Sequence, residues 1–540
     1  MTSPAGGNLA LLSPSSSTST GLQRGFLCIL FLAVFLAGLL RIPALGVRPM
    51  HNDEAVNAVK FGRLWEKSAF KYDPNEFHGP SLFYTTLAIA RLTSSPDFAH
   101  LTEIKLRLVT VAFGLGLILL LPLLVDGLGR AATLWAAFFT AVSPAMVFYS
   151  RYYIHEMLLA FFTLFALAAG WRYWRTRRIG WVLGAGAALG LMQATKETFV
   201  LPVAAALLAL GLNQVWNRKL DASGLPLRKP GPKPSHLVAG AAIWLLIWFM
   251  LFSSFGTNPK GLLDSLLTFF PWLKRAGGES PHIHPWYFYL QRLLFFHTAK
   301  DPVWSEAVIF VLASVGAGAA FVRRGLKDAD SSFVRFLVLY SFGLCAMYSF
   351  ISYKTPWCLI GFWSGMILVA GVGAGIIARS LKPQLARIAV VVAIGGATVQ
   401  LAAQAWQSGH EFASSSGNPY VYSPTSDDIL KMVAKVESIS TAHQDGHGLL
   451  LKVMAPDDDY WPLPWYLRAF GNVGWWNQVP ADPFAPMMIV SSRFRAGLDE
   501  TKTHQMVGIF QLRRQEFFEL YVEVNLWRAW LKTRPPEKEE

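Results

Sequence analysis

The sequence has little charge and little cysteine. Only 15% of its 540 residues are charged, whereas a soluble globular protein carries about 25%. Its three cysteines, Cys28, Cys345 and Cys358, lie in apolar stretches, which excludes a disulfide-stapled secreted domain and a cysteine-ligated metal centre. Because 53% of the residues are hydrophobic, a disordered chain is also excluded. Most of the protein is therefore expected to lie in a membrane.

Common catalytic motifs and repeats are absent as well. There is no Walker motif, no GxSxG, no HExxH and no solenoid period. The formal net charge is +14, but no basic patch is interleaved with aromatic residues, so nucleic acid is not an expected partner. In a membrane protein such an excess of Lys and Arg indicates cytoplasmic loops, and the 20 Trp residues suit membrane interfaces.

Eleven apolar runs approach the length of about 20 residues that a helix needs to cross a bilayer. They cover residues 26–46, 106–125, 131–149, 157–174, 180–195, 198–215, 236–255, 303–322, 333–352, 357–378 and 386–405. Only Lys196 and Glu197 separate the fifth run from the sixth, which predicts a tight hairpin. The pattern predicts a mainly α, polytopic membrane protein with about eleven transmembrane helices.

Basic loops set the expected orientation, because cytoplasmic loops are enriched in Lys and Arg. These loops contain Arg172, Arg175, Arg177 and Arg178; Arg218, Lys219, Arg228, Lys229 and Lys233; Arg323, Arg324 and Lys327; and Arg379, Lys382 and Arg387. The N-terminus is then cytoplasmic, with a Ser/Thr/Gly-rich segment 1–25 predicted to be disordered. An odd number of crossings places the C-terminus outside the cell membrane.

Three segments are then extracytoplasmic. In the first, 47–105, the stretches Asp53–Phe70 and Pro80–Leu92 predict short helices along the membrane surface. The second is the loop 256–302. The third, 406–540, is more polar and carries β-rich runs such as LLLKVM and PMMIVSS, which predict a soluble α/β domain after a transmembrane domain over 26–405.

Acids and bases collect at four helix junctions on this outer face. They are Asp53 and Glu54; Arg151, His155 and Glu156; Lys196 and Glu197; and Lys354. Ionisable groups near a membrane are costly unless they are paired or functional. The pattern therefore predicts an outward-facing polar cavity.

Each candidate also has a structural reading. Asp53 could act as a general base or cap the following helix. His78 could contact a substrate, or could simply precede a helix that starts at Pro80. Lys196, Lys354 and Arg151 could hold a lipid phosphate. The alternatives are a Lys196–Glu197 pair, a snorkelling Lys354 and an interfacial Arg151 anchor.

A divalent metal is a further hypothesis, and no other cofactor is expected. His282 and His284 have a spacing that could bind a metal along a strand, with Glu156 or Asp53 as further ligands. The structural alternative is a pair of loop histidines near Trp286.

Several motifs together resemble the GT-C membrane glycosyltransferases. They are HNDEA, HGPSLFY, RYYIHE, ATKET, YKTPW and WPLPWYLR, in this order along the chain. The nearest groups are the protein O-mannosyltransferase and aminoarabinose-transferase types, and within them the archaeal and bacterial family described as flippase-activity-associated.

This resemblance implies an inverting transfer of a sugar from a polyprenyl-phosphate donor to a hydroxyl of a glycan, lipid or protein acceptor outside the membrane. It implies that Asp53 is the base, that Glu54 completes the pair and that Glu156 is a second outer acid. It also places Lys354 near the donor phosphate. One departure is that the usual His/Lys-Pro-Pro-Leu is His78-Gly79-Pro80-Ser81-Leu82 here.

Two other functions use the same residues. A lipid-linked glycan flippase, or an accessory to one, would move a headgroup without breaking a bond and would need an inward polar path. A catalytically inactive scaffold would bind partners through its tail. The ionisable residues cluster only on the outer face, so the sequence favours the enzyme over a flippase.

Overall fold

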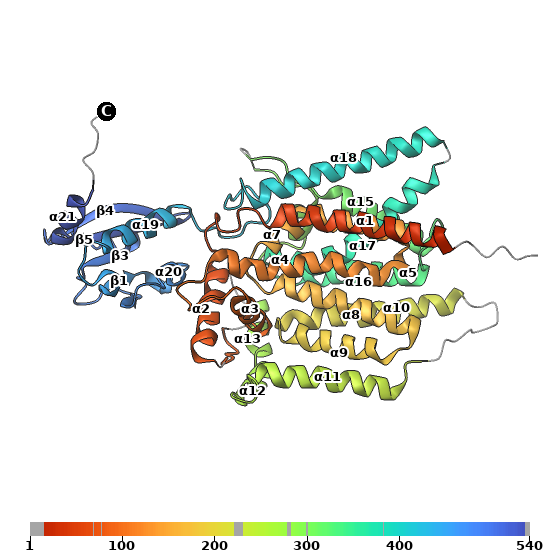
Figure 1. Ribbon diagram of the computed structural model, residues 1–540, viewed down its shortest axis with the longest axis horizontal. Coiled ribbons are helices and arrows are strands. Elements are labelled where there is room, and N and C mark those ends of the chain that lie inside the picture. Colours follow the sequence, from red (N-terminus) through yellow and green to blue (C-terminus); the bar gives the residue numbers. More distant parts are fainter. Residues whose placement is uncertain are drawn as a thin grey trace, which may run out of the picture.

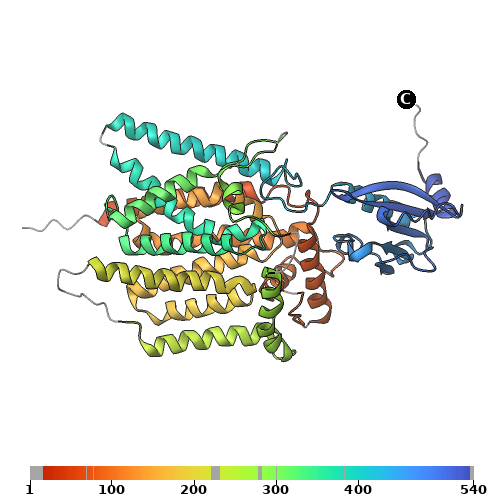
Figure 2. The same ribbon diagram turned by 180° about the vertical axis from the view of Figure 1, so that it is seen from behind.

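A computed structural model describes residues 16–534 of the protein, apart from 69, 77, 221–230, 278–281, 299–300 and 382. A long helical bundle and a small sheet domain follow one another along the longest axis (Figures 1 and 2). The end of the bundle that faces the sheet is called the domain end below. The predicted basic residues Arg228, Lys229 and Lys382 lie outside the described residues, as do residues 1–15 of the segment expected to be disordered.

All eleven apolar runs are helical. The bundle consists of α1 (Ser16–Arg41), α4 (Glu103–Leu120), α5 (Val125–Leu128), α6 (Arg130–Val142), α7 (Pro144–Ser150), α8 (Glu156–Thr176), α9 (Ile179–Gln193), α10 (Val200–Leu220), α11 (Pro234–Phe252), α15 (Ala307–Val322), α16 (Ser331–Phe350), α17 (Leu359–Ser380) and α18 (Gln384–Gly409). Helix α1 starts at Ser16, so residues 16–25 extend the first helix by a polar stretch instead of forming part of the predicted disordered segment.

Within the described residues, eight helices are long and apolar enough to cross a membrane. Helices α6 and α7, bent by 57° at Ser143, would form a ninth span. The two remaining runs correspond to α9 and α15, which are apolar but shorter. The chain is therefore a multi-pass membrane protein, as its composition predicted.

The short helix α9 packs closely inside the bundle. A Cβ on Gly186 would lie 2.1 Å from the carbonyl oxygen of Gly240 in α11. Two backbones can approach this closely only where side chains are missing, which is how small residues act between membrane helices. The small-residue pattern of this run thus serves helix packing.

Short helices cover the domain end of the bundle (Figure 1). Helices α2 (Asn52–Lys67) and α3 (Ser81–Leu92) agree with the two surface helices predicted for the first outer segment. The second outer segment contains α12 (Lys260–Leu267), α13 (Phe269–Gly277) and α14 (Phe288–Leu294), which the sequence analysis missed because each spans fewer than ten residues.

The C-terminal segment folds into a five-stranded sheet with strand order β2-β1-β3-β5-β4. The strands are β1 (Leu451–Met454), β2 (Val473–Trp476), β3 (Met487–Ser491), β4 (His504–Arg513) and β5 (Glu516–Glu523). Strands β1 to β3 pair in parallel, and β5 pairs antiparallel with β3 and β4. Helices α19 (Asp428–Ser440), α20 (Leu463–Tyr466) and α21 (Val524–Lys532) accompany the sheet. The predicted α/β tail and its two β-rich runs are confirmed.

The sheet domain is docked on the loop that precedes α2. The backbone N–H of Met50 donates to Tyr466 Oη (2.7 Å), and Thr425 Oγ1 donates to the Met50 carbonyl oxygen (2.8 Å). Trp465 Nε1 donates to Glu103 Oε1 in α4 (2.7 Å). Both backbone polar groups of Met50 are thus satisfied by the C-terminal domain, three residues before Asp53.

Glu54 is fully buried at the centre of this region. Its carboxylate accepts hydrogen bonds from Arg107 (2.9 and 3.0 Å), from Arg48 (2.7 Å) and from the backbone N–H groups of His51 (3.0 Å) and Tyr153 (2.9 Å). Burial alone would raise the pKa of Glu54, but the two guanidinium groups outweigh it and lower the pKa to about 2. Glu54 therefore ties three segments together and remains charged at any physiological pH.

We predict that Glu54→Gln lowers the free energy of unfolding by about 3–5 kcal/mol, because Arg107 would be left buried without its counter-charge. Thermal unfolding in detergent measures this, with the exposed Glu66→Gln on the same helix as control. The contribution of Glu54 is present above its ordinary pKa of 4.5 and is lost as the pH falls toward 2. Equal stability of the two variants would contradict a structural role.

Candidate functional site

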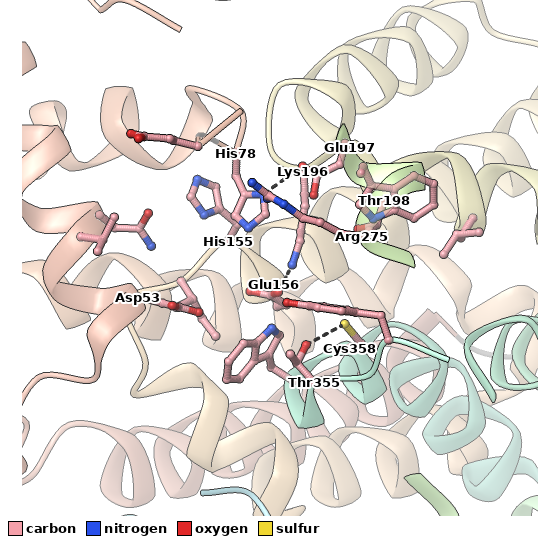
Figure 3. Close-up of a pocket in the computed structure, with 18 of the residues that line it drawn as sticks. Asp53, His78, His155, Glu156, Lys196, Glu197, Thr198, Arg275, Thr355 and Cys358 are labelled. Atoms are coloured by element: carbon pink, nitrogen blue, oxygen red, sulfur yellow. Dashed lines mark hydrogen bonds and ion pairs between the residues drawn. The ribbon is translucent and has the colours of Figure 1, made fainter. Parts of the chain in front are cut away.

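A polar cavity lies at the domain end of the bundle, where five of the predicted motifs meet (Figure 3). It encloses about 1140 Å³, its open mouth included. The lining residues that carry acid, base or hydroxyl groups are Asp53, Lys60, Glu76, His78, His155, Glu156, Lys196, Glu197, Thr198, Arg275, Tyr348, Tyr353 and Thr355. Asp53, Glu156, Lys196, His78, His155 and Glu197 were all predicted to share one site.

Asp53 stands in the first turn of α2 and its side chain is exposed to the cavity. No described residue makes a hydrogen bond or ion pair with its carboxylate. The helix is capped by His51 instead, whose Nδ1 accepts from the backbone N–H of Asp53 (3.1 Å), while Glu54 accepts from His51 N. The structural reading of Asp53 as the helix cap is therefore not supported, and its carboxylate is available to a ligand.

Glu156 and Lys196 form a buried ion pair in the same cavity as Asp53 (Figure 3). Glu156 begins α8, and Lys196 precedes the turn that leads into α10. Burial alone would lower the pKa of Lys196, but Glu156 outweighs this effect and raises it. Lys196 therefore stays protonated, and its charge is held in place by Glu156. The predicted alternative, a Lys196–Glu197 pair, does not form.

Two histidines lie side by side on another wall. His78 Nδ1 is 2.9 Å from Glu197 Oε2, and the ring centroids of His78 and His155 are 5.2 Å apart. Burial lowers the pKa of His155 well below its ordinary value, so its ring is neutral at pH 7. His155 Nε2 lies 3.1 Å from the Gly79 carbonyl oxygen, which requires a proton on Nε2 and leaves Nδ1 as an acceptor.

Gly79 joins two of the sequence motifs. Its N–H donates to the Thr195 carbonyl oxygen (3.0 Å), and the N–H of Ser81 donates to the Ala194 carbonyl oxygen (2.8 Å). A Cβ on residue 79 would lie 2.2 Å from the Ala194 carbonyl oxygen, so no larger residue fits. The departure to His-Gly-Pro-Ser thus has a structural reason: this segment runs against the backbone that positions Lys196.

Three predicted residues do not line the cavity. Glu54 is the buried structural carboxylate described above. Arg151 Nη1 donates to the carbonyl oxygens of Arg41 (2.8 Å) and Pro43 (2.7 Å), at the C-terminus of α1. Lys354 is buried, and its Nζ donates to the His284 carbonyl oxygen (3.0 Å). Tyr353 and Thr355, its neighbours in the chain, line the cavity in its place.

The hypothesis of a metal site gains no support. His282 Nδ1 and His284 Nε2 both face Tyr422 Oη, at 2.5 and 3.4 Å. Among the residues that the structure describes, no three His, Cys, Asp or Glu side chains are placed to hold a metal ion. The two histidines therefore do not converge with Glu156 or Asp53.

The sequence analysis missed some residues of the cavity. Arg275 and Trp272 come from α13, and Lys60 comes from the middle of α2. Arg275 donates to the Asn75 carbonyl oxygen, and Lys60 Nζ donates to that of Glu76 (2.7 Å). No motif marks Arg275. Its neighbour Lys274 carries the same charge, so the sequence gives no reason to choose one of them over the other.

One protein family matches the part of the chain that contains several of these motifs. The family of dolichyl-phosphate-mannose-protein mannosyltransferases matches residues 78–227, which include His78, Glu156 and Lys196. No curated protein sequence matches the chain.

Solved structures with similar architecture cover nearly the whole chain. ArnT from Cupriavidus metallidurans, in a structure bound to undecaprenyl phosphate, is 13% identical with a TM-score of 0.59, over 94% of this chain and 99% of that one. The oligosaccharyltransferase of Archaeoglobus fulgidus, tethered to an acceptor peptide, is 13% identical with a TM-score of 0.51, over 84% of this chain and 64% of that one. The chain thus has the fold of the GT-C membrane glycosyltransferases, as its motifs predicted.

Proposed function

We propose that the protein is a membrane glycosyltransferase that moves a sugar from a polyprenyl-phosphate donor to an acceptor hydroxyl, with Asp53 as general base. The observation that carries this proposal is the arrangement inside one cavity. An unpaired, exposed carboxylate faces a buried Glu156–Lys196 pair at the end of a membrane bundle. Two structural neighbours, one bound to undecaprenyl phosphate and one tethered to an acceptor peptide, support a lipid-linked donor and an acceptor.

The chemistry needs little more than positioning and charge. The acceptor oxygen forms a bond to the sugar C1 and gives its proton to the Asp53 carboxylate. The bond between C1 and the phosphate oxygen breaks on the opposite side, which inverts the anomeric centre. The phosphate leaves with its negative charge, and fixed cations stabilise it as that charge develops.

Two cations of the cavity suit this leaving phosphate. Lys196 is buried and permanently charged, with Glu156 holding its ammonium group in one place. Arg275 is exposed to the cavity and makes no ion pair with a described carboxylate, so its guanidinium can bind phosphate oxygens. Lys196 was predicted for this role together with Lys354 and Arg151, and Arg275 takes the place of those two.

The charges at the other end of the bundle support a cavity that faces outward. The ends of α8, α15 and α17 away from the sheet domain carry Arg175, Arg323 and Arg379. Since basic loops stay in the cytoplasm, the domain end with the cavity faces the outside of the cell membrane.

We predict that Asp53→Asn reduces transfer by roughly 10²–10⁴-fold, because a general base contributes about that much. Purified protein, a radiolabelled polyprenyl-phosphate sugar and an acceptor glycan supply the measurement. Asp97→Asn serves as the matched control, since Asp97 is exposed and lies outside this cavity. Full activity of Asp53→Asn would remove this carboxylate from the mechanism. Movement of donor across vesicles without transfer would indicate a flippase.

We also predict that Arg275→Gln lowers kcat/KM for the donor by about 10- to 100-fold, since a hydrogen bond to a charged group contributes about 1.5–3 kcal/mol. Lys274→Gln, the neighbouring charge on α13, should have little effect because Lys274 does not line the cavity. Equal losses in both variants would point to a general effect of surface charge.

A further inference from the structure

A second cavity adjoins the first and is strongly basic. It encloses about 1300 Å³, its mouth included, between the C-terminal half of α2, the loop that follows it and the start of α12. Five cationic side chains line it: Lys60, Arg63, Lys67, Lys71 and Lys260. Two carboxylates, Asp73 and Asp264, also line it. Because burial lowers the pKa of Lys60 to about 7, the charge count rests on the other four cations, which exceed the carboxylates by two. We call this cavity the basic cleft.

Four cations of the basic cleft have no partner among the residues that the structure describes. Arg63, Lys67, Lys71 and Lys260 are all exposed. Within the described part of the chain, none of these four side chains makes a hydrogen bond or an ion pair. Like charges gathered around a concave surface repel one another and raise the local concentration of anions. A structural role would instead have produced pairs such as Glu156–Lys196.

The basic cleft and the reaction cavity share a wall. Lys60 lines both of them. The thin segment 73–76 lies between the two cavities: Asn75 faces the basic cleft and Glu76 faces the reaction cavity. Lys60 and Arg275 hold this segment through hydrogen bonds to the carbonyl oxygens of Glu76 and Asn75. The two cavities are therefore neighbours, separated by segment 73–76 and the Lys60 side chain.

We propose that the basic cleft binds the phosphate groups of an anionic acceptor glycan, while a hydroxyl of the same glycan lies at Asp53. This inference rests on the proposed transfer and names the chemical class of its acceptor. Phosphate oxygens are strong acceptors for Lys and Arg. Phospholipid headgroups carry the same chemistry, but the position of the basic cleft beside the reaction cavity, with Lys60 lining both, favours a substrate.

The test uses the full-length protein in nanodiscs of phosphatidylcholine. Isothermal titration calorimetry compares a phosphorylated oligosaccharide, its unphosphorylated parent and inorganic phosphate. The variant R63Q/K67Q/K71Q removes three exposed charges of the basic cleft and leaves the reaction cavity intact. The variant K274Q is the control, because Lys274 is an exposed cation that lines neither cavity.

We expect the phosphorylated oligosaccharide to bind at least about tenfold more weakly to the triple variant, with K274Q unchanged and with affinity falling as salt is added. Asp53→Asn should bind it normally, which separates a failure of the cleft from a failure of the proposed transfer. Equal binding to the wild type and the triple variant would overturn the proposal. Equal affinity for inorganic phosphate and for the phosphorylated oligosaccharide would also overturn it.

A final arm adds phosphatidylglycerol to the nanodiscs. If the anionic lipid abolishes binding of the phosphorylated glycan to the wild type, the basic cleft holds lipid headgroups and the proposal is overturned. Persistent binding at physiological salt supports a site built for a glycan.

Discussion

The buried Glu54 carboxylate holds the functional end of the molecule together. It binds Arg48 and Arg107 and accepts backbone N–H groups from the start of α2 and from the turn before α8. A buried ion pair is weak evidence for net stability, but the loss of one partner is costly. Here the Glu54 contacts fix the relative positions of two segments, one of which carries Asp53 and the other Glu156.

The C-terminal domain adds a second constraint on the same place. Tyr466 and Thr425 bind the N–H and the carbonyl oxygen of Met50. Asn52, with its amide oriented to satisfy both neighbours, lies 3.0 Å from the Trp461 carbonyl oxygen and 3.1 Å from Arg513 Nη1. The backbone that carries Asp53 is therefore held from the membrane side by Glu54 and from the opposite side by the sheet domain.

The electrostatics of the reaction cavity follow from unequal pairing. Glu156 is neutralised by Lys196, and Glu197 faces His78, whereas Asp53 has no described partner. An unpaired carboxylate can accept a proton from a substrate. A paired ammonium group can keep its charge while it binds phosphate. In the adjoining basic cleft, the exposed side chains of Arg63, Lys67, Lys71 and Lys260 likewise make no ion pair with a described residue.

Hydropathy and charge alone determined the membrane bundle, the surface helices α2 and α3 and the α/β tail, because these depend on the length and period of apolar runs. The acids and bases at the predicted helix junctions also indicated that Asp53, Glu156 and Lys196 share one cavity. Tertiary structure alone assigned Glu54, Arg151 and Lys354 to buried hydrogen-bond networks and brought Arg275 into the cavity. The reason is physical: identical side chains serve as ligands or as structural pairs according to which groups the folded backbone places beside them.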